Sequence, residues 1–209
     1  MFRLTPPNQL TLLRIALTPL FVFLFFSESS INRQISLLVY IFAATTDWYD
    51  GYVARRWGYI TRWGKFLDPL ADKILTSAAF ISFIYIGYAE AWMVWVIVIR
   101  DILITGLRSY AEFTHRTFDT SSFAKTKTFL QMVVIYLFIV VYVVRTTEIQ
   151  FTDYGKFIDT YASLLLMQGL MLVVTILTAL TGILYLQKNF STIKNLFSGQ
   201  IRGTESEHN

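Results

Sequence analysis

Four aspartates interrupt an otherwise apolar part of the sequence, and they form two closely spaced pairs. Asp47 and Asp50 are three residues apart, and Asp68 and Asp72 are four residues apart, so on helices the members of each pair share one face. An acid in the middle of a membrane-spanning helix costs about 2.5–3.5 kcal/mol. The four acids therefore require cations, a water-filled cavity or both, and four converging carboxylates suit hard divalent cations.

Small residues and a cation accompany the first acidic pair. Gly51 and Ala54 follow Asp47 by four and seven residues, and Arg55 follows it by eight. Small side chains let a large ligand approach the helix backbone, and an arginine beside a metal site can pair with a phosphate. Two simpler interpretations stay open: the small residues only pack helices together, and the acids only form salt bridges. Partners for such salt bridges are available at Arg55, Arg56 and Lys73.

The elements that must position these groups are long apolar segments. Of the 209 residues, 55% are hydrophobic and only 15% are charged, whereas an average soluble domain has about 25% charged residues. Because only helices and closed barrels satisfy the backbone in lipid, and the runs do not alternate as barrel strands do, we expect an all-α, polytopic membrane protein with six transmembrane helices. The expected helices are Asn8–Phe26, Ile35–Arg56, Lys65–Ile86, Ala91–Phe113, Ala124–Val144 and Tyr161–Gln187.

Composition also excludes several classes of protein. The chain has no cysteine, which excludes disulfide frameworks, thiol catalysis and cysteine-ligated metal sites. Its two histidines, His115 and His208, are too far apart in sequence to suggest a shared metal. Too little polar sequence remains for a nucleic-acid-binding module, so we attribute the net charge of +4 to cytoplasmic loops.

The connections between the expected helices differ in charge, and this difference predicts the orientation. The cations on one side are Arg3, Arg55, Arg56, Arg62, Lys65, Arg116, Lys188, Lys194 and Arg202, and those on the other are Arg33, Arg145 and Lys156. The positive-inside rule then places both termini in the cytoplasm, and we expect the active-site cavity to open on that side of a bacterial inner membrane. Residues 1–188 form the membrane domain, and residues 189–209 form a polar cytoplasmic tail that we expect to be loosely ordered.

The four acids are part of a longer pattern with fixed spacing. The segment Asp47-Trp-Tyr-Asp50-Gly51-Tyr-Val-Ala54-Arg55 is followed after eight residues by Gly64, and then at intervals of three residues by Asp68 and Asp72. Every fixed position matches the motif of the CDP-alcohol phosphatidyltransferases, so the chain resembles that family. The resemblance extends to Pro7–Arg14, Phe66–Lys73 and Ala124–Thr128, and it departs at Asp101, where we expect glutamate.

The resemblance implies a reaction and a cofactor. The chain would transfer the phosphatidyl group of CDP-diacylglycerol to sn-glycerol 3-phosphate and release CMP, by direct displacement without a covalent intermediate. Asp47, Asp50, Asp68 and Asp72 would hold two Mg²⁺ ions, or Mn²⁺ in their place. Asp72 would also be the general base that removes the proton from the attacking hydroxyl. The family further implies membrane lipid as a partner and a homodimer.

Binding residues follow from the resemblance and from the charge of the acceptor. The residues expected to contact CDP-diacylglycerol are Asn8, Thr11, Gly51, Ala54, Arg55 and Thr61, with Arg14 near the nucleotide. The acceptor carries a phosphate and therefore requires cations. The cations expected in its pocket are Lys73, Arg108, Lys125 and Lys127. The alternative is that Arg100–Asp101 and Arg108–Glu112 are internal ion pairs that brace the helices.

Two other functions stay open. A transferase of the same family could use another acceptor, such as inositol, serine or a phospholipid. A divalent-cation transporter could use the aspartates as its pathway, but it gives no reason for the spacing of Gly51, Ala54, Arg55 and Gly64.

Overall fold

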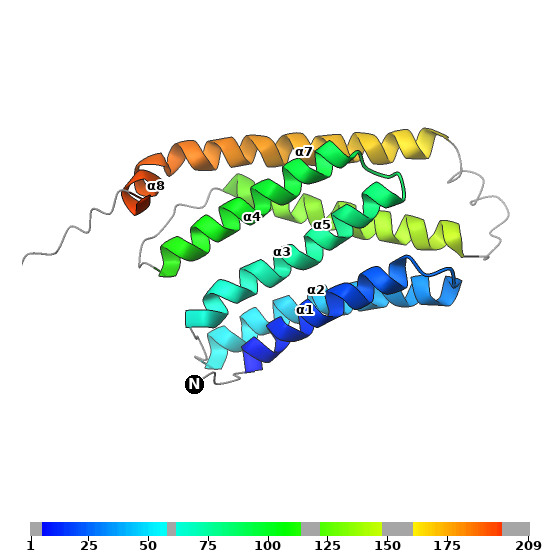
Figure 1. Ribbon diagram of the computed structural model, residues 1–209, viewed down its shortest axis with the longest axis horizontal. Helices are drawn as coiled ribbons and strands as arrows, with labels where there is room; N and C mark the ends of the chain where they lie inside the picture. The colour runs from blue at the N-terminus through cyan, green and yellow to red at the C-terminus, as the bar shows by residue number, and fades with distance from the viewer. Residues whose placement is uncertain (1–5, 58–61, 114–121, 148–160, 198–209) are drawn as a thin grey trace, which may run out of the picture.

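The computed structural model describes residues 6–57, 62–113, 122–147 and 161–197 of the chain. All regular structure in these ranges is α-helical, which confirms the all-α prediction. The helices are α1 Pro6–Phe25, α2 Ser30–Trp57, α3 Arg62–Tyr85, α4 Ala91–Phe113, α5 Ser122–Thr146, α7 Tyr161–Lys188 and α8 Phe190–Phe197. Figure 1 shows the long helices lying side by side along the length of the molecule.

The long helices coincide with the apolar segments expected from the sequence. The segment Ala91–Phe113 is α4 itself, and the other five agree to within about five residues at each end, as expected for boundaries read from a pattern. The turn between α3 and α4 depends on Gly87, which has a φ of 77°. The amide of Gly87 donates to the Ile84 carbonyl and that of Tyr88 to the Phe83 carbonyl. This pattern ends a helix at a glycine and turns the chain back at once.

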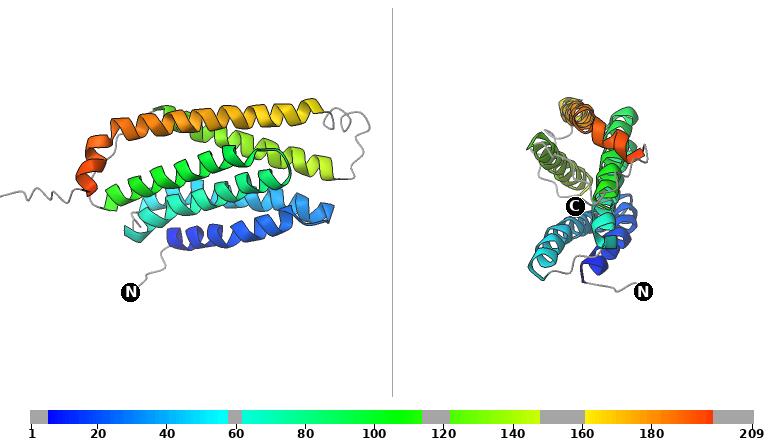
Figure 2. Two further views of the ribbon diagram at one scale, coloured as in Figure 1. Left: turned by 45° about the horizontal axis from the view of Figure 1, so that its top comes forward. Right: turned by 90° about the vertical axis from the view of Figure 1, so that its left-hand side faces the viewer.

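The helices contact one another in a closed ring. Around the ring, α1 packs against α2, α2 against α5, α5 against α7, α7 against α4, α4 against α3, and α3 against α1. Helix α3 also contacts α2 and α5, so it lies against four neighbours. The end-on view in Figure 2 shows this arrangement. Helix α3 carries Asp68 and Asp72.

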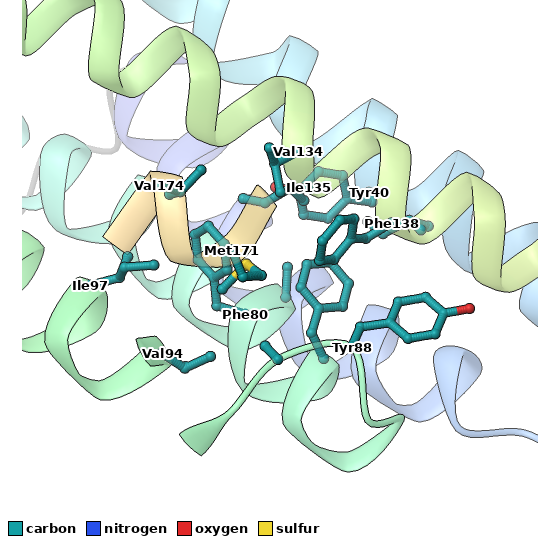
Figure 3. Close-up of a cluster of buried hydrophobic side chains, with 14 of the residues drawn as sticks. Tyr40, Phe80, Tyr88, Val94, Ile97, Val134, Ile135, Phe138, Met171 and Val174 are labelled. Carbon is teal, nitrogen blue, oxygen red and sulfur yellow. The ribbon is translucent and has the colours of Figure 1, made fainter. Parts of the chain in front are cut away.

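An aromatic core fills the interior between the helices (Figure 3). Phe25 of α1 lies 4.4 Å from Tyr142 of α5 between ring centroids, and Phe83 of α3 lies 5.2 Å from Phe138 of α5. Tilted and edge-on pairs at such distances add about 0.5–1.5 kcal/mol each beyond the burial of the rings. The core therefore holds α5 against α1 and α3.

The outer surface is also apolar. Large hydrophobic side chains such as Phe23, Phe129 and Leu165 are 70% exposed or more. Two segments in the described ranges, Thr126–Thr146 and Leu164–Lys188, are long and apolar enough to cross a membrane, and Gln9–Phe25 is a shorter apolar helix. A surface of this kind suits lipid as its solvent.

The expectation for the tail is wrong in one place. Residues Phe190–Phe197 form helix α8 instead of being loosely ordered. The amide of Ile193 donates to the carbonyl of Asn189 at 2.9 Å, so helical bonding resumes directly after α7. The apolar residues Phe190, Ile193 and Phe197 are three and four positions apart, a helical spacing that the polar composition of the tail conceals.

Candidate functional site

The two acidic pairs lie at the same end of the bundle. Helix α2 ends at Trp57 and α3 begins at Arg62, so Asp47 and Asp50 near the end of α2 belong to the same end as Asp68 and Asp72 near the start of α3. At the left of Figure 1 this end also contains the start of α1 and the end of α4. We call it the acidic end.

Several of the expected site residues fall outside what the structure describes. Thr61 lies between the described ranges. A further group belongs to helices whose backbone is described, but the side chains lie outside the described residues: Asn8 in α1, Asp47, Asp50, Gly51, Ala54 and Arg55 in α2, and Lys125 in α5. Their contacts stay predictions.

Asp68 is half-buried and joined to α1. Its Oδ1 accepts a hydrogen bond from the hydroxyl of Thr11, a side chain that is only 3% exposed. One turn further along α1, the guanidinium of the buried Arg14 donates from Nε to the carbonyl of Ala43 in α2 at 3.3 Å. Thr11 was expected to contact CDP-diacylglycerol. No local pattern predicts its bond to Asp68, because the two residues are 57 positions apart and lie on different helices.

Asp72 remains accessible and has a cationic neighbour. Its side chain is 19% exposed, and its Oδ2 lies 3.4 Å from the Nζ of Lys73. Of the salt bridges considered as a simpler explanation for the acids, this one is present. No group of three or more histidine, cysteine or acidic side chains is found in the part of the chain that the structure describes. The side chains of Asp47 and Asp50 lie outside that part, so the described half of the acidic quartet contributes two carboxylates.

These two carboxylates fit the divalent cations that the family motif implies. Asp68 and Asp72 are one helical turn apart on α3, and their oxygens are the hard ligands that Mg²⁺ and Mn²⁺ prefer. Thr11 holds one oxygen of Asp68, in the manner of the outer hydrogen bonds that orient metal ligands.

Beside Asp72, a buried cluster joins α3, which carries Asp72, to α4 and α5. Asp101 of α4 is 4% exposed, and its Oδ1 bonds to the Nζ of Lys127 and, at 2.9 Å, to the guanidinium of Arg100. Its Oδ2 accepts a bond from the amide of Gln131 at 3.2 Å and lies 3.8 Å from the Nζ of Lys73. We call these five residues the Asp101 cluster. Lys73 lies between Asp101 and Asp72, and it links the cluster to the acidic pair.

Among the described side chains of this region, positive and negative charges are unequal in number. The cations Lys73, Arg100 and Lys127 share the two carboxylates of Asp72 and Asp101. The side chains of Lys73 and Arg100 are 15% and 16% exposed, whereas that of Lys127 is 3% exposed. Positive charge that lies largely out of water requires a partner, so the partly exposed edge of the cluster suits an anion.

The structure brings together part of the expected phosphate pocket. Lys73 and Lys127 meet at Asp101, whereas Arg108 is exposed two turns further along α4. The alternative ion pair Arg100–Asp101 is also present.

Two residues of α7 near this site had no sequence signal. The second terminal nitrogen of Arg100 donates to the hydroxyl of Thr181 at 3.1 Å. A Cβ at Gly182 would lie 2.9 Å from the Cγ of Arg100, so the glycine makes room for this side chain. Both contacts depend on α7 packing against α4, which no local pattern reveals.

Comparison with known proteins gives a family and several relatives. A family model described as CDP-alcohol phosphatidyltransferase matches residues 4–149. A protein of Bacillus subtilis (strain 168) named CDP-diacylglycerol–glycerol-3-phosphate 3-phosphatidyltransferase is 39% identical over 141 residues, which cover 62% of this chain and 73% of the relative. Proteins of the same name are 37% identical over 126 residues in Rickettsia bellii (60% and 70% covered) and 38% identical over 136 residues in Pectobacterium atrosepticum (62% and 74% covered). Helices α7 and α8 lie beyond the segment that the family model matches.

Proposed function

Because the chain belongs to the CDP-alcohol phosphatidyltransferase family, we propose that it transfers the phosphatidyl group of CDP-diacylglycerol to sn-glycerol 3-phosphate and releases CMP. The names of its relatives describe this reaction. The acidic motif that first indicated the family lies within the matched residues 4–149.

The observation that carries the choice of acceptor is the surplus of positive charge beside Asp72. Among the side chains that the structure describes, three cations share two carboxylates there. Glycerol 3-phosphate brings an anionic phosphate that compensates this charge through strong charge-assisted hydrogen bonds. Inositol and serine carry no phosphate and leave the surplus uncompensated.

The position of Lys73 connects acceptor binding to proton transfer. Its ammonium lies 3.4 Å from a carboxylate oxygen of Asp72, so a phosphate that Lys73 binds brings the rest of the acceptor close to Asp72. Asp72 accepts the proton of the glycerol hydroxyl as general base. The hydroxyl oxygen then forms a bond to the phosphorus of the phosphatidyl group, and the bond from that phosphorus to CMP breaks.

The remaining expected residues complete the two binding sites. Asp47, Asp50, Asp68 and Asp72 would hold two divalent cations, Mg²⁺ or Mn²⁺, which would supply positive charge to neutralise a diphosphate and its leaving oxygen. The residues proposed for CDP-diacylglycerol are Asn8, Thr11, Gly51, Ala54, Arg55 and Thr61, and those for the acceptor phosphate are Lys73, Arg108, Lys125 and Lys127.

We further propose that the six long helices cross a bacterial inner membrane, with both termini and the opening of the active-site cavity on the cytoplasmic side. The exposed apolar side chains on the outside of the bundle support this arrangement. The start of α1 and the end of α7 lie at the same end of the molecule (Figure 1), as an even number of crossings requires. The membrane domain then comprises residues 1–188, and the tail 189–209. The protein acts as a homodimer.

Release of CMP from CDP-diacylglycerol tests the proposal directly. The full chain is incubated in mixed micelles with Mg²⁺ and, in separate reactions, glycerol 3-phosphate, inositol, serine or phosphatidylglycerol. We expect CMP only with glycerol 3-phosphate, and none after chelation of the metal. Equal release with inositol or serine would assign another acceptor. Divalent-cation flux into vesicles without any CMP release would identify a transporter.

A further inference from the structure

Asp101 differs from Asp68 and Asp72 because donors of the protein surround its carboxylate. It is 4% exposed, and both of its oxygens are already engaged. A carboxylate offers about four acceptor positions, and four donors from three helices surround this one: Lys127, Arg100, Gln131 and Lys73. Asp101 is therefore neither a metal ligand nor a base.

We propose that Asp101 is a positioning residue that holds Lys73 and Lys127 for the phosphate of the acceptor, and that α7 holds Asp101 in turn through Arg100. This inference rests on the proposed function. It assigns a role to Asp101, Arg100, Thr181 and Gly182, none of which was expected to contact a substrate.

The lysines need such a partner because of their flexibility. A lysine ammonium sits on a four-carbon stem with many rotamers, and ordering it costs entropy unless a fixed group holds it. Asp101 binds the ammonium of Lys127 from α5 and lies 3.8 Å from that of Lys73 from α3. Each ammonium has three donors, so one bond to Asp101 leaves others for a phosphate.

Helix α7 fixes the other side of the carboxylate. The guanidinium of Arg100 bonds to Asp101 at 2.9 Å through one terminal nitrogen and to Thr181 at 3.1 Å through the other. Gly182 lies against the stem of Arg100 so closely that an added methyl group would meet its Cγ at 2.9 Å. The planar guanidinium thereby links α7 to the carboxylate with little freedom to rotate.

Positioning and simple charge compensation predict opposite effects. Replacing Asp101 with asparagine keeps the size of the side chain but adds one positive charge to the cluster. If Asp101 acted through its charge alone, the phosphate would then bind more tightly. If it positions the lysines, the phosphate binds more weakly, because the ammonium groups lose their fixed partner. The sign of the change in KM for glycerol 3-phosphate separates the two.

The experiment compares purified full-length variants in mixed micelles. For Asp101→Asn we expect KM for glycerol 3-phosphate to rise about tenfold, as for the loss of a hydrogen bond to a charged group, with KM for CDP-diacylglycerol within about twofold. Asp101→Glu keeps the charge and is expected to recover most of the affinity. A KM for glycerol 3-phosphate that falls or stays unchanged in Asp101→Asn would overturn the proposal.

Two variants without a charge change test the proposal independently, in case Asp101→Asn does not fold. Thr181→Val removes only the hydroxyl that holds Arg100, and Gly182→Ala displaces the stem of Arg100. Each is expected to raise KM for glycerol 3-phosphate about threefold, and unchanged values in both would overturn the proposal on their own.

Arg33→Met, at the opposite end of the bundle, is the matched control and should leave both KM values unchanged. A wild-type chain that releases no CMP with glycerol 3-phosphate would instead refute the proposed function, and this inference with it.

Discussion

The two ends of the helix bundle both hold cations, but they satisfy them in different ways. At the end opposite the acidic end, Arg33 of α2 donates to the carbonyl of Thr146 at the end of α5 at 3.0 Å, and Arg145 lies 3.4 Å from the hydroxyl of Tyr88. In the Asp101 cluster the cations instead contact a carboxylate. Lys73, Arg100 and Lys127 share the carboxylate of Asp101.

The difference separates structural cations from those suited to a ligand. A backbone carbonyl at a helix end lacks a helical partner, so Arg33 completes the hydrogen bonding of α5 and holds two helices together. The cations of the Asp101 cluster outnumber the carboxylates that they contact within the described part of the chain. Changes at the acidic end should therefore alter catalysis and substrate binding, and changes at the opposite end should alter stability alone.

The largest expected effect comes from Asp72→Asn. The amide cannot accept the proton of the glycerol hydroxyl, so the rate of CMP release should fall by about a thousandfold. The side chain is 19% exposed, and the thermal unfolding midpoint should change little. The measurement is CMP release at saturating concentrations of both substrates. A residual rate within about tenfold of wild type would remove Asp72 as the base.

Arg108→Ala should produce the next largest effect. Arg108 is exposed two turns beyond Asp101 on α4, and we propose that it belongs to the pocket of the acceptor phosphate. Loss of a charge-assisted bond should raise KM for glycerol 3-phosphate about 30-fold, with a much smaller rise for CDP-diacylglycerol. Steady-state kinetics with each substrate varied in turn measures both values. Equal rises for the two substrates would exclude Arg108 from the acceptor pocket.

Thr11→Val tests whether the bond to Asp68 tunes metal binding. Valine has nearly the shape of threonine but cannot donate to the Asp68 carboxylate. Loss of such an outer hydrogen bond weakens metal affinity by about tenfold, so the Mg²⁺ concentration for half-maximal activity should rise by about that factor. Thr11→Ser keeps the hydroxyl and serves as the control. A rise in KM for CDP-diacylglycerol at unchanged Mg²⁺ dependence would favour the direct contact expected from the sequence.

Local sequence patterns predicted the helices well, because each long helix contains a long apolar run that can be recognised without knowledge of its partners. The spacing of Asp68 and Asp72 likewise placed both carboxylates one turn apart on α3. The bonds between helices could not be predicted in this way. Arg100 contacts Thr181, 81 residues away, because α4 packs against α7, and the order of helices around the ring is a property of the whole fold. Helix α8 was missed because eight residues are too few for a clear period.

The smallest effect is expected at Tyr88, at the opposite end of the bundle. Its hydroxyl lies 3.4 Å from the guanidinium of Arg145, and its ring lies 5.7 Å from that of Phe138 and 5.6 Å from the Arg145 guanidinium carbon. Tyr88→Phe removes only the hydroxyl and should cost about 0.5–1 kcal/mol of unfolding free energy. Tyr88→Leu also removes the aromatic and cation–π contacts and should cost about 1–2 kcal/mol more.

Thermal unfolding in detergent measures both Tyr88 variants, and steady-state kinetics on the same samples gives the two KM values. Because about three turns of α4 separate Tyr88 from Asp101, both variants should lose stability and keep the KM values of the wild type. A shift in KM for glycerol 3-phosphate in either variant would mean that the aromatic core transmits strain to the acidic end. Changes at one end would then affect substrate binding at the other, and Arg33→Met would no longer be a valid control for the Asp101 cluster.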